Sequence, residues 1–424
     1  MNYLRILVLC CGWLVSFSAA QAQGRIKGVV QDSITNEPLS FASVFLANTT
    51  LGATTTESGT FDFAKVPPGT YELVGSYVGY RLAKQTITVG PTPLQVTLRL
   101  APTGQQLGEV VVQPAPNKPE EYKKFTELFL GGTSFSAQCT ISNPEAVRVL
   151  FDDTDNELSV RAKEYVQIDN DALGYRLKYF GLDFSHNEDD GSVAYVGQPV
   201  FEEMTSPDEA KRRKWAANRL TAYKGSFMHF LRSVYQNRLK EEGFLVQQVR
   251  VLYNPRYEQI EKQREALQKS RPDGAFTAAE QDSLDRWARA VPVTATLNTN
   301  ALPIDSIRRV SADGRHTYLR FTGELQVAYF GEAPDPRYKR KMSPLGAPPR
   351  GTTYPANRQV SRLKLQGKEA EIQANGSLLN PLDVYNGEYW GFERIGEFLP
   401  VDYNPPASAT VRPAAPARPA PPRR

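Results

Sequence analysis

Side chains suited to ligand chemistry gather between positions 218 and 232 of the sequence. Asn218 and Arg219 lie in one predicted helix, and His229 and Arg232 lie in the next. If these four side chains converge, they can hold an anionic or sugar ligand, with His229 as a proton donor or as a hydrogen-bonding group. The pattern therefore gives a candidate ligand site at these four residues.

A packing interpretation explains the same segment without any ligand. Trp215, Asn218, Arg219 and Tyr223 recur at i, i+3, i+4 and i+8, which is one face of a helix. Trp215 and Tyr223 would then lie in the core, and Arg219 would pair with an acid. Both interpretations stay open on the sequence alone.

A second candidate lies near the end of the sequence, where Tyr389 and Trp390 stand between Gly387 and Gly391. Exposed aromatic side chains of this kind contact sugars or proteins. Packing into a core is the alternative for both residues.

The common catalytic motifs are missing from the sequence. A zinc peptidase needs a histidine followed by a glutamate three or four residues later, and none of His186, His229 and His316 has one. A Gly-x-Ser-x-Gly elbow and a Gly-x-x-x-x-Gly-Lys phosphate loop are also absent. We therefore expect no metal site, no cofactor, no catalytic residue and no enzyme of these classes. A pair of carboxylates can lie anywhere in a sequence, so a hydrolase of that kind stays open.

Two further features have structural interpretations. The acidic run from Asp152 to Glu157 has carboxylates at alternate positions, but it lacks the glycine and the final glutamate of an EF-hand. We expect a solvated hairpin turn there. Cys139 is the only cysteine after Cys10 and Cys11, and a small buried thiol is the expected role for it.

The first 22 residues have the three parts of a secretory signal. Arg5 precedes an apolar run from Ile6 to Phe17, and Ala20-Gln21-Ala22 forms a small-residue cleavage site. The mature chain is expected to begin near Gln23 and to be exported. No later segment approaches 18 consecutive apolar residues, so no transmembrane helix is expected in the mature chain.

The distribution of charge argues against a nucleic-acid partner. The net charge of the 424 residues is +4, and the tail from Pro405 to Arg424 supplies four arginines and no acid. The rest of the mature chain is therefore close to neutral. Nucleic-acid binding requires a basic patch or stripe, which this composition does not indicate.

Between Gly24 and Leu100, short apolar runs alternate with turn residues about every 8 to 12 residues, which is typical of a β-sandwich. Several short motifs in this segment follow one another in the order of a known family: Gly28-Val29-Val30-Gln31-Asp32, Glu37-Pro38-Leu39, Ala42-Ser43-Val44, Gly52, Gly59-Thr60-Phe61, Pro67-Pro68-Gly69-Thr70-Tyr71 and Val78-Gly79-Tyr80. They resemble the carboxypeptidase regulatory-like domain. That resemblance implies a transthyretin-like or prealbumin-like sandwich of about seven strands.

The resemblance also carries functional expectations. The family is an accessory sandwich without catalytic groups, and it precedes the plug of many TonB-dependent outer-membrane receptors, where a segment similar to Leu107–Val112 follows it. This implies an envelope location and a docking role. Where relatives commonly have aspartates in the turn before the glycine, this chain has Thr56 and Ser58, so cation binding is not expected in that turn.

The rest of the sequence predicts an α+β region with an antiparallel sheet and several helices. Helices are expected at 207–223 and 226–242 and after a capping box at Thr277, and hairpin turns at 152–157, 190–191 and 313–314. The expected organisation is a signal peptide (1–22), the sandwich (23–112), a proline-bearing linker (113–119), an α+β domain (120–292), a mainly β region (293–403) and a disordered Pro/Ala/Arg tail (404–424).

Three functional hypotheses follow from the sequence. The first is a noncatalytic interaction or structural protein of the periplasm or outer membrane, in which the sandwich docks onto an envelope protein partner. The second is a carbohydrate-binding protein with a glycan ligand. The third is an envelope hydrolase that uses carboxylates in the α+β body.

Overall fold

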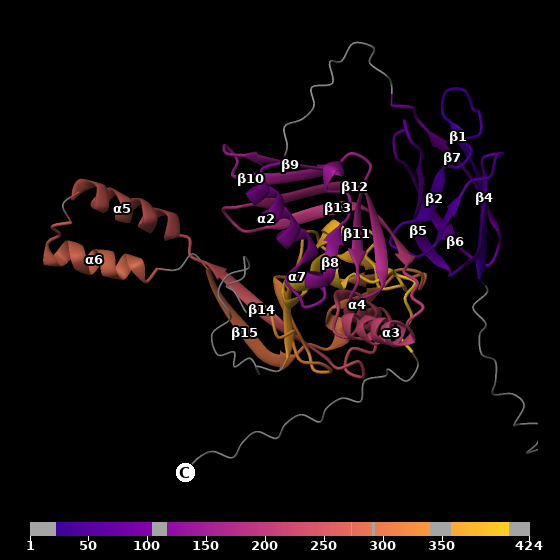
Figure 1. Cartoon of the computed structure of the whole chain (residues 1–424). Coiled ribbons are helices and arrows are strands. Elements are labelled where there is room, and N and C mark those ends of the chain that lie inside the picture. The colour runs from indigo at the N-terminus through magenta and orange to yellow at the C-terminus, as the bar shows by residue number, and fades with distance from the viewer. Residues whose placement is uncertain (1–22, 104–116, 273, 291–292, 340–357, 407–424) are drawn as a thin grey trace, which may run out of the picture. The chain divides into compact units, whose positions relative to one another are not determined.

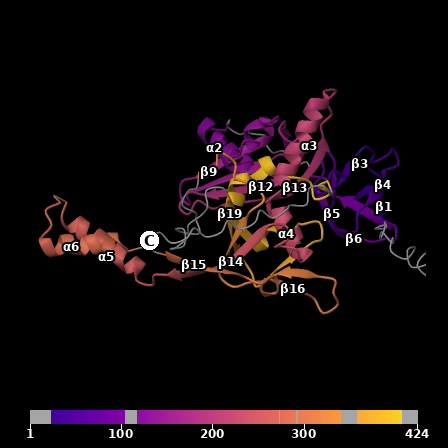
Figure 2. The ribbon, with the colours of Figure 1, turned by 90° about the horizontal axis from the view of Figure 1, so that it is seen from below.

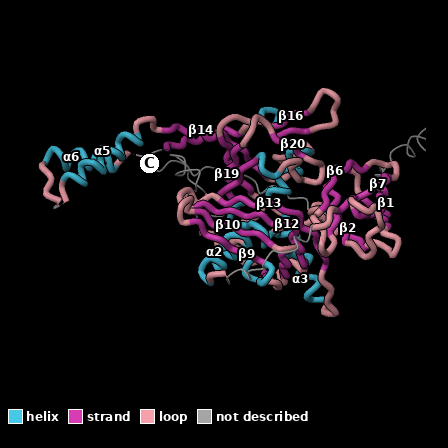
Figure 3. The backbone as a smooth tube through the Cα atoms, turned by 90° about the horizontal axis from the view of Figure 1, so that it is seen from above, coloured by secondary structure: helices cyan, strands magenta, loops and turns pink. Residues whose placement is uncertain are grey.

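The computed structural model describes residues 23–103, 117–272, 274–290, 293–339 and 358–406. The predicted signal peptide, the Leu107–Val112 segment, and most of the predicted linker and tail lie outside the described residues. The chain divides into two compact units, the N-terminal unit (1–113 with 198–201) and the second unit (114–197 with 202–424). Strands form much of the regular structure of each unit (Figure 3).

Two sheets form the N-terminal unit. One has the order β4-β1-β7, with β1 antiparallel to β4 and parallel to β7, and the other has the antiparallel order β3-β2-β5-β6. The strands are β1 (Gly24–Asp32), β2 (Ser43–Leu46), β3 (Gly52–Thr54), β4 (Thr60–Val66), β5 (Gly69–Ser76), β6 (Ala83–Val89) and β7 (Leu94–Leu100).

The period-two pattern of these strands builds one core. Phe61 and Phe63 on β4 are buried between exposed neighbours, and so are Val96 and Leu98 on β7. Burying each such side chain stabilises the fold by about 1.5–3 kcal/mol. These residues pack with Ile26 and others in one apolar cluster. The prediction of a β-sandwich at the N-terminus is confirmed.

The second unit begins with a helix and a six-stranded antiparallel sheet. The helix is α2 (Pro119–Leu130), and the strands are β8 (Cys139–Ile141), β9 (Val147–Asp152), β10 (Glu157–Ala162), β11 (Tyr165–Asn170), β12 (Tyr175–Asn187) and β13 (Val193–Glu203). Phe125 and Phe129 of α2 contact Phe184 edge to face, which fixes the helix against the sheet. The hairpin turn expected at 152–157 joins β9 and β10.

A second antiparallel sheet has the order β15-β14-β18-β19-β21, and a small sheet has the order β16-β17-β20. The strands are β14 (Phe244–Tyr253), β15 (Val293–Ala301), β16 (Arg308–Val310), β17 (Thr317–Leu319), β18 (Glu324–Tyr329), β19 (Gln359–Leu365), β20 (Ala370–Ile372) and β21 (Val384–Glu388). The turn expected at 313–314 joins β16 and β17. Glu324 and Arg362 form a buried ion pair between β18 and β19.

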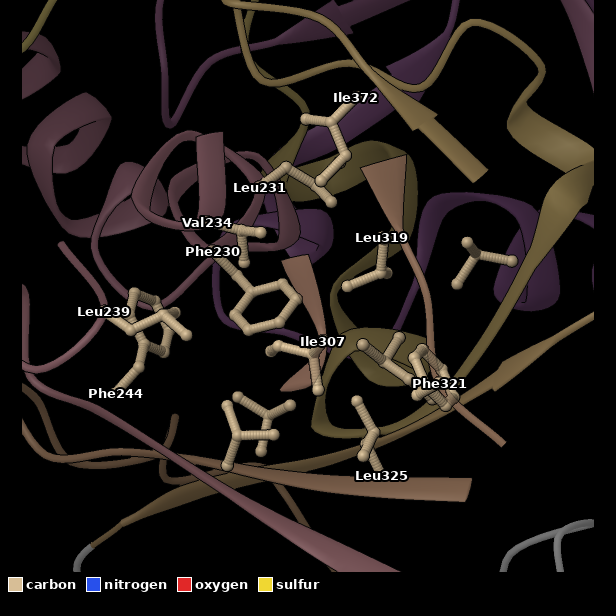
Figure 4. Packing of buried hydrophobic residues seen from close by; sticks show 14 of the residues in the cluster. Phe230, Leu231, Val234, Leu239, Phe244, Ile307, Leu319, Phe321, Leu325 and Ile372 are labelled. Atoms are coloured by element: carbon tan, nitrogen blue, oxygen red, sulfur yellow. The ribbon is translucent and has the colours of Figure 1, made fainter. Parts of the chain in front are cut away.

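Helices and turns complete the second unit. They are α3 (Glu209–Tyr223), α4 (Phe227–Tyr235), α5 (Tyr257–Ser270), α6 (Ala278–Ala288), α7 (Tyr389–Glu393) and the short 3-10 helices η1 (Ser136–Gln138), η2 (Pro144–Ala146), η3 (Ile304–Ser306), η4 (Pro381–Asp383) and η5 (Arg394–Glu397). Phe230, Leu231 and Val234 of α4 enter a core with Leu319 and Leu325 from the sheets (Figure 4).

Two predicted helices differ in their ends. The first begins at Glu209 instead of residue 207, because Asp208 is the N-cap and its side chain accepts from the backbone N–H of Ala210. The second ends at Tyr235 instead of residue 242, because Asn237 adopts a left-handed conformation with φ of 60° that a helix cannot contain.

The helical pair α5 and α6 has no fully buried side chain. The capping box predicted at Thr277 is present, because Thr277 accepts from Glu280 N–H and the Glu280 carboxylate accepts from Thr277 N–H. The pair lies between β14 and β15 in the chain, and in Figures 1 and 2 it lies beyond the ends of these two strands. None of the helices in the described residues is long and apolar enough to cross a membrane.

Candidate functional site

The turn between α3 and α4 organises the polar centre of the second unit. Gly225 has a φ of 80°, which favours glycine, and its backbone N–H donates to Nδ1 of His229 at 3.1 Å. Ser226 is the N-cap of α4 and accepts from the His229 N–H. The Gly225 carbonyl in turn accepts from Trp390 Nε1 at 2.7 Å.

The two bonds to His229 define its tautomer. Because Nδ1 accepts the Gly225 N–H, the ring proton lies on Nε2, which donates to Glu242 Oε2 at 3.3 Å. Burial lowers the pKa of His229, while its hydrogen bond to Glu242 acts in the opposite direction. His229 is 3% exposed, so this ring is a buried hydrogen-bonding group.

Arg232, also on α4, is bound to the backbone of the C-terminal segment. Its guanidinium donates to the carbonyl oxygens of Asn375, Val401 and Tyr403 at 2.8–3.0 Å, and it is 7% exposed. A guanidinium with three carbonyl partners joins chain segments that are distant in sequence. This contact stabilises the fold.

Asn218 and Arg219 lie on α3 and contact a different part of the backbone. Asn218 donates to the Ala172 carbonyl, and Arg219 donates to the carbonyls of Leu173 and Gly174. Arg219 also lies over the ring of Tyr175 at 3.8 Å. The structure therefore brings Asn218 together with Arg219 at the turn between β11 and β12, and His229 together with Arg232 on α4.

Trp215 and Tyr223, the apolar members of the same helix face, are buried. Trp215 donates to the Asp171 carbonyl, and Tyr223 lies 4.8 Å from the ring of His229. Arg219 has an acidic neighbour in Glu203 at 3.4 Å. The packing interpretation predicted these features, namely Trp215 and Tyr223 in the core and Arg219 beside an acid.

Tyr389 and Trp390 are also in the core, with exposed fractions of 4% and 6%. The Tyr389 hydroxyl accepts from the backbone N–H of Asp335, and Trp390 contacts Phe227 and Phe230. These two residues form no exposed aromatic strip.

A group of carboxyls that the sequence did not single out lies on α7, η5 and the segment after β18. We call Glu332, Asp335, Glu393 and Glu397 the carboxyl cluster. Burial raises the pKa of Glu332 to about 7 and that of Glu397 to about 8. Burial, with the charges of its three neighbours, also raises the pKa of Glu393. Carboxyls with such raised pKa values keep part or all of their protons near neutral pH, and in the protonated form they can donate a hydrogen bond or a proton.

Three buried oxygens beside this cluster have no hydrogen-bond partner: Tyr329 Oη, Gln359 Oε1 and Glu332 Oε2. No spacing rule in the sequence relates these residues, because Tyr329 ends β18 and Gln359 begins β19 across the sheet. Their chain positions alone gave no signal for such a site.

No metal centre is visible in the parts of the chain that the structure describes, where no group of three or more His, Cys, Asp or Glu side chains could hold an ion. Burial raises the pKa of the free Cys139 thiol to about 12, which makes it a poor nucleophile. In the N-terminal unit, the Thr56 hydroxyl bonds to Ser58 and Thr60 in the turn around Gly59.

At one end of the sandwich, a side-chain contact ties two loops together. Asp32 Oδ1 accepts from the backbone N–H groups of Ile34 and Thr35, and Asp32 Oδ2 accepts from the Tyr80 hydroxyl at 2.7 Å. These bonds lower the pKa of Asp32. The loops present Ile34 and Val78 to solvent, 73% and 79% exposed.

Comparison with known families identifies this sandwich. Residues 26–112 match the model of the CarboxypepD_reg-like domain. The N-terminal sandwich is a CarboxypepD_reg-like domain. The match ends at residue 112, before the second unit begins. No curated protein matches the chain.

Solved structures of low identity are similar to parts of the chain. One is the C-terminal domain of the shaft pilin SpaA from Lactobacillus rhamnosus GG, at 18% identity and a TM-score of 0.15, covering 19% of this chain and 97% of that one. Another is BcpA, the major pilin subunit of Bacillus cereus, at 18% identity and a TM-score of 0.16, covering 18% of this chain and 30% of that one. Each of these two similarities covers less than a fifth of this chain.

Proposed function

We propose that the protein is a noncatalytic binding or structural component of the bacterial cell envelope, and that its CarboxypepD_reg-like domain is the docking module. The observation that carries the proposal is the pair of exposed apolar side chains, Ile34 and Val78, on loops tied by the bond between Asp32 and Tyr80. Loops held in place before binding lose little conformational entropy when a partner covers them.

The two candidate ligand-binding arginines of the second unit support the noncatalytic part of the proposal. The guanidinium groups of Arg219 and Arg232 are bound to backbone carbonyls, so their polar groups hold the fold together. An exported location rests on the predicted signal at residues 1–22, which lies outside the described residues. The partner expected there is another envelope protein.

Site-specific crosslinking in the native envelope tests the docking surface. A photoreactive amino acid at position 34 or 78 is expected to give the same discrete adduct. Position 86 on the edge strand β6 is the matched control, because Thr86 is exposed on the same domain. Ile34→Asp should reduce the adduct formed at position 78. Equal adducts at all three positions, or none at any, would count against the docking role.

The other two hypotheses depend on other residues. A glycan strip at Tyr389 and Trp390 would require exposed rings, and both are buried. A hydrolase would require two acids, at least one of them with a raised pKa. Glu332 and Glu397 both have a raised pKa. Hydrolysis is therefore the second candidate. Its test is whether the chain releases reducing sugars from envelope polysaccharide and whether Glu397→Gln abolishes that release.

A further inference from the structure

The unpartnered oxygens flank one carboxyl group. The Tyr329 hydroxyl lies 2.3 Å from where a Cβ on Gly331 would be, directly before Glu332. Gln359 donates from Nε2 to the carbonyl of Ala333, directly after Glu332, and its Oε1 has no partner. Tyr329 and Gln359 are 1% and 4% exposed. A buried polar atom without a partner costs about 1–3 kcal/mol, so each one requires an explanation.

The hydrogen-bonding chemistry of these three oxygens defines which ligand groups can be their partners. Gln359 Oε1 only accepts hydrogen bonds, an ionised Glu332 Oε2 only accepts, and Tyr329 Oη can accept. A ligand group with several N–H donors can therefore satisfy all three. Ammonium and guanidinium groups do so, and each carries the charge that matches a carboxylate.

Other carboxyls lie around this position. Glu393 and Glu397 each interact electrostatically with Glu332 and Asp335. None of the four carboxylates forms an ion pair with any residue that the structure describes. Glu332, Asp335 and Glu397 are half-buried, so part of the cluster contacts solvent, while Glu393 lies at 9% exposure.

We infer that Glu332, Tyr329 and Gln359 form a binding site for an organic cation, a ligand with a terminal ammonium or guanidinium group. The described residues contain no group able to hold a metal ion, which favours the organic cation over a metal. This site lies in the second unit and is independent of the docking surface on the sandwich.

Binding at this site is coupled to protons. Burial raises the pKa of Glu332, and the positive charge of Lys224 and the Thr221 hydroxyl act in the opposite direction. The unliganded Glu332 carboxyl has a pKa of about 7 and must lose its proton to pair with a cation. Affinity should therefore rise between pH 6 and pH 8, with proton release on binding.

Isothermal titration calorimetry on the full chain tests the site with two probes, agmatine for the guanidinium group and 1,4-diaminobutane for the ammonium group. At least one probe is expected to bind, more tightly at pH 8 than at pH 6. Tyr329→Phe removes only the hydroxyl and should weaken binding roughly tenfold. Glu332→Gln should abolish binding, and Glu157→Gln, a half-buried carboxylate on β10, is the matched control that should leave it unchanged.

The outcomes separate the cation site from its alternatives. If neither probe binds at millimolar concentration, water alone satisfies the three oxygens and the inference is wrong. Binding of calcium in competition with both probes would overturn the ligand class. A thermal melt shows whether Glu332→Gln folds. If it does not fold, the test is the Tyr329→Phe variant. The site would be contradicted if this variant bound the cation probe as tightly as the natural chain does.

Discussion

The backbone N–H of Gly225 donates to Nδ1 of His229 at 3.1 Å, and this bond joins the end of α3 to the start of α4. It needs the left-handed conformation of Gly225, with φ of 80°. The same bond keeps the His229 proton on Nε2 and so directs the ring to Glu242. The backbone conformation of Gly225 thus sets the orientation of the His229 ring and its hydrogen bond to Glu242.

Gly225→Ala is expected to destabilise the protein well beyond the usual cost of a left-handed alanine, which is about 1 kcal/mol. The added Cβ would lie 2.0 Å from Gln359 Oε1 and 2.6 Å from Tyr329 Cδ1. Gly314→Ala is the control, because Gly314 has a similar φ of 73° and nothing within 4 Å of its Cβ position. Chemical denaturation measures the difference, and equal losses in the two variants would show that the contacts at Gly225 are unimportant.

The sequence predicted the parts of the fold that depend on local patterns. Alternating apolar residues from β4 and β7 predicted the sandwich because side chains of a strand alternate between its two faces. Turn residues such as Asp313 and Gly314 predicted a hairpin because their conformational preferences are local.

The candidate site could not be predicted in the same way. The partners of Arg219 and Arg232 are backbone carbonyls of distant segments, and every residue type has a carbonyl. The carboxyl cluster combines Glu332 with Glu393 and Glu397, which meet only after the strands have paired. Their pKa shifts arise from burial, which is a property of the folded chain.

Arg232→Met should lower the free energy of unfolding by at least about 2 kcal/mol, because it leaves three carbonyl oxygens without a donor. Arg213→Met on α3 is the control, since Arg213 is an exposed partner of Glu209 and should contribute less than about 1 kcal/mol. Urea denaturation of both variants checks the expectation. A loss at Arg232 no larger than that at Arg213 would restore a role in ligand binding for Arg232.

Glu324→Gln is expected to cost about 3–5 kcal/mol, because it leaves the charge of Arg362 in the interior without its carboxylate. Replacing both residues by apolar ones, Glu324→Leu with Arg362→Met, should recover part of the loss. Glu369→Gln, which breaks the more exposed pair with Arg309, should cost less than about 1 kcal/mol. Thermal melts of the single and double variants distinguish these cases.

The stability of the second unit should fall as pH rises from 6.5 to 8. The pKa of Glu332 is about 7 and that of Glu397 about 8 in the folded chain, above the ordinary value of 4.5. The folded state therefore binds more protons than the unfolded state in this window, and the free energy of unfolding decreases with pH. His229 has a lowered pKa, so its opposite contribution is confined to pH values below about 6.5.

Denaturation with urea at a series of pH values measures this slope directly. Glu332→Gln combined with Glu397→Gln should flatten it, because neither glutamine titrates and both keep the size of the native side chains. Glu157→Gln, whose carboxylate lies on β10, should leave the slope as it is. If the free energy of unfolding of the natural chain stays constant between pH 6.5 and 8, the carboxyl cluster is already ionised in the folded state. Binding of a cation would then release no proton, and the proton coupling inferred for the cation site would be wrong.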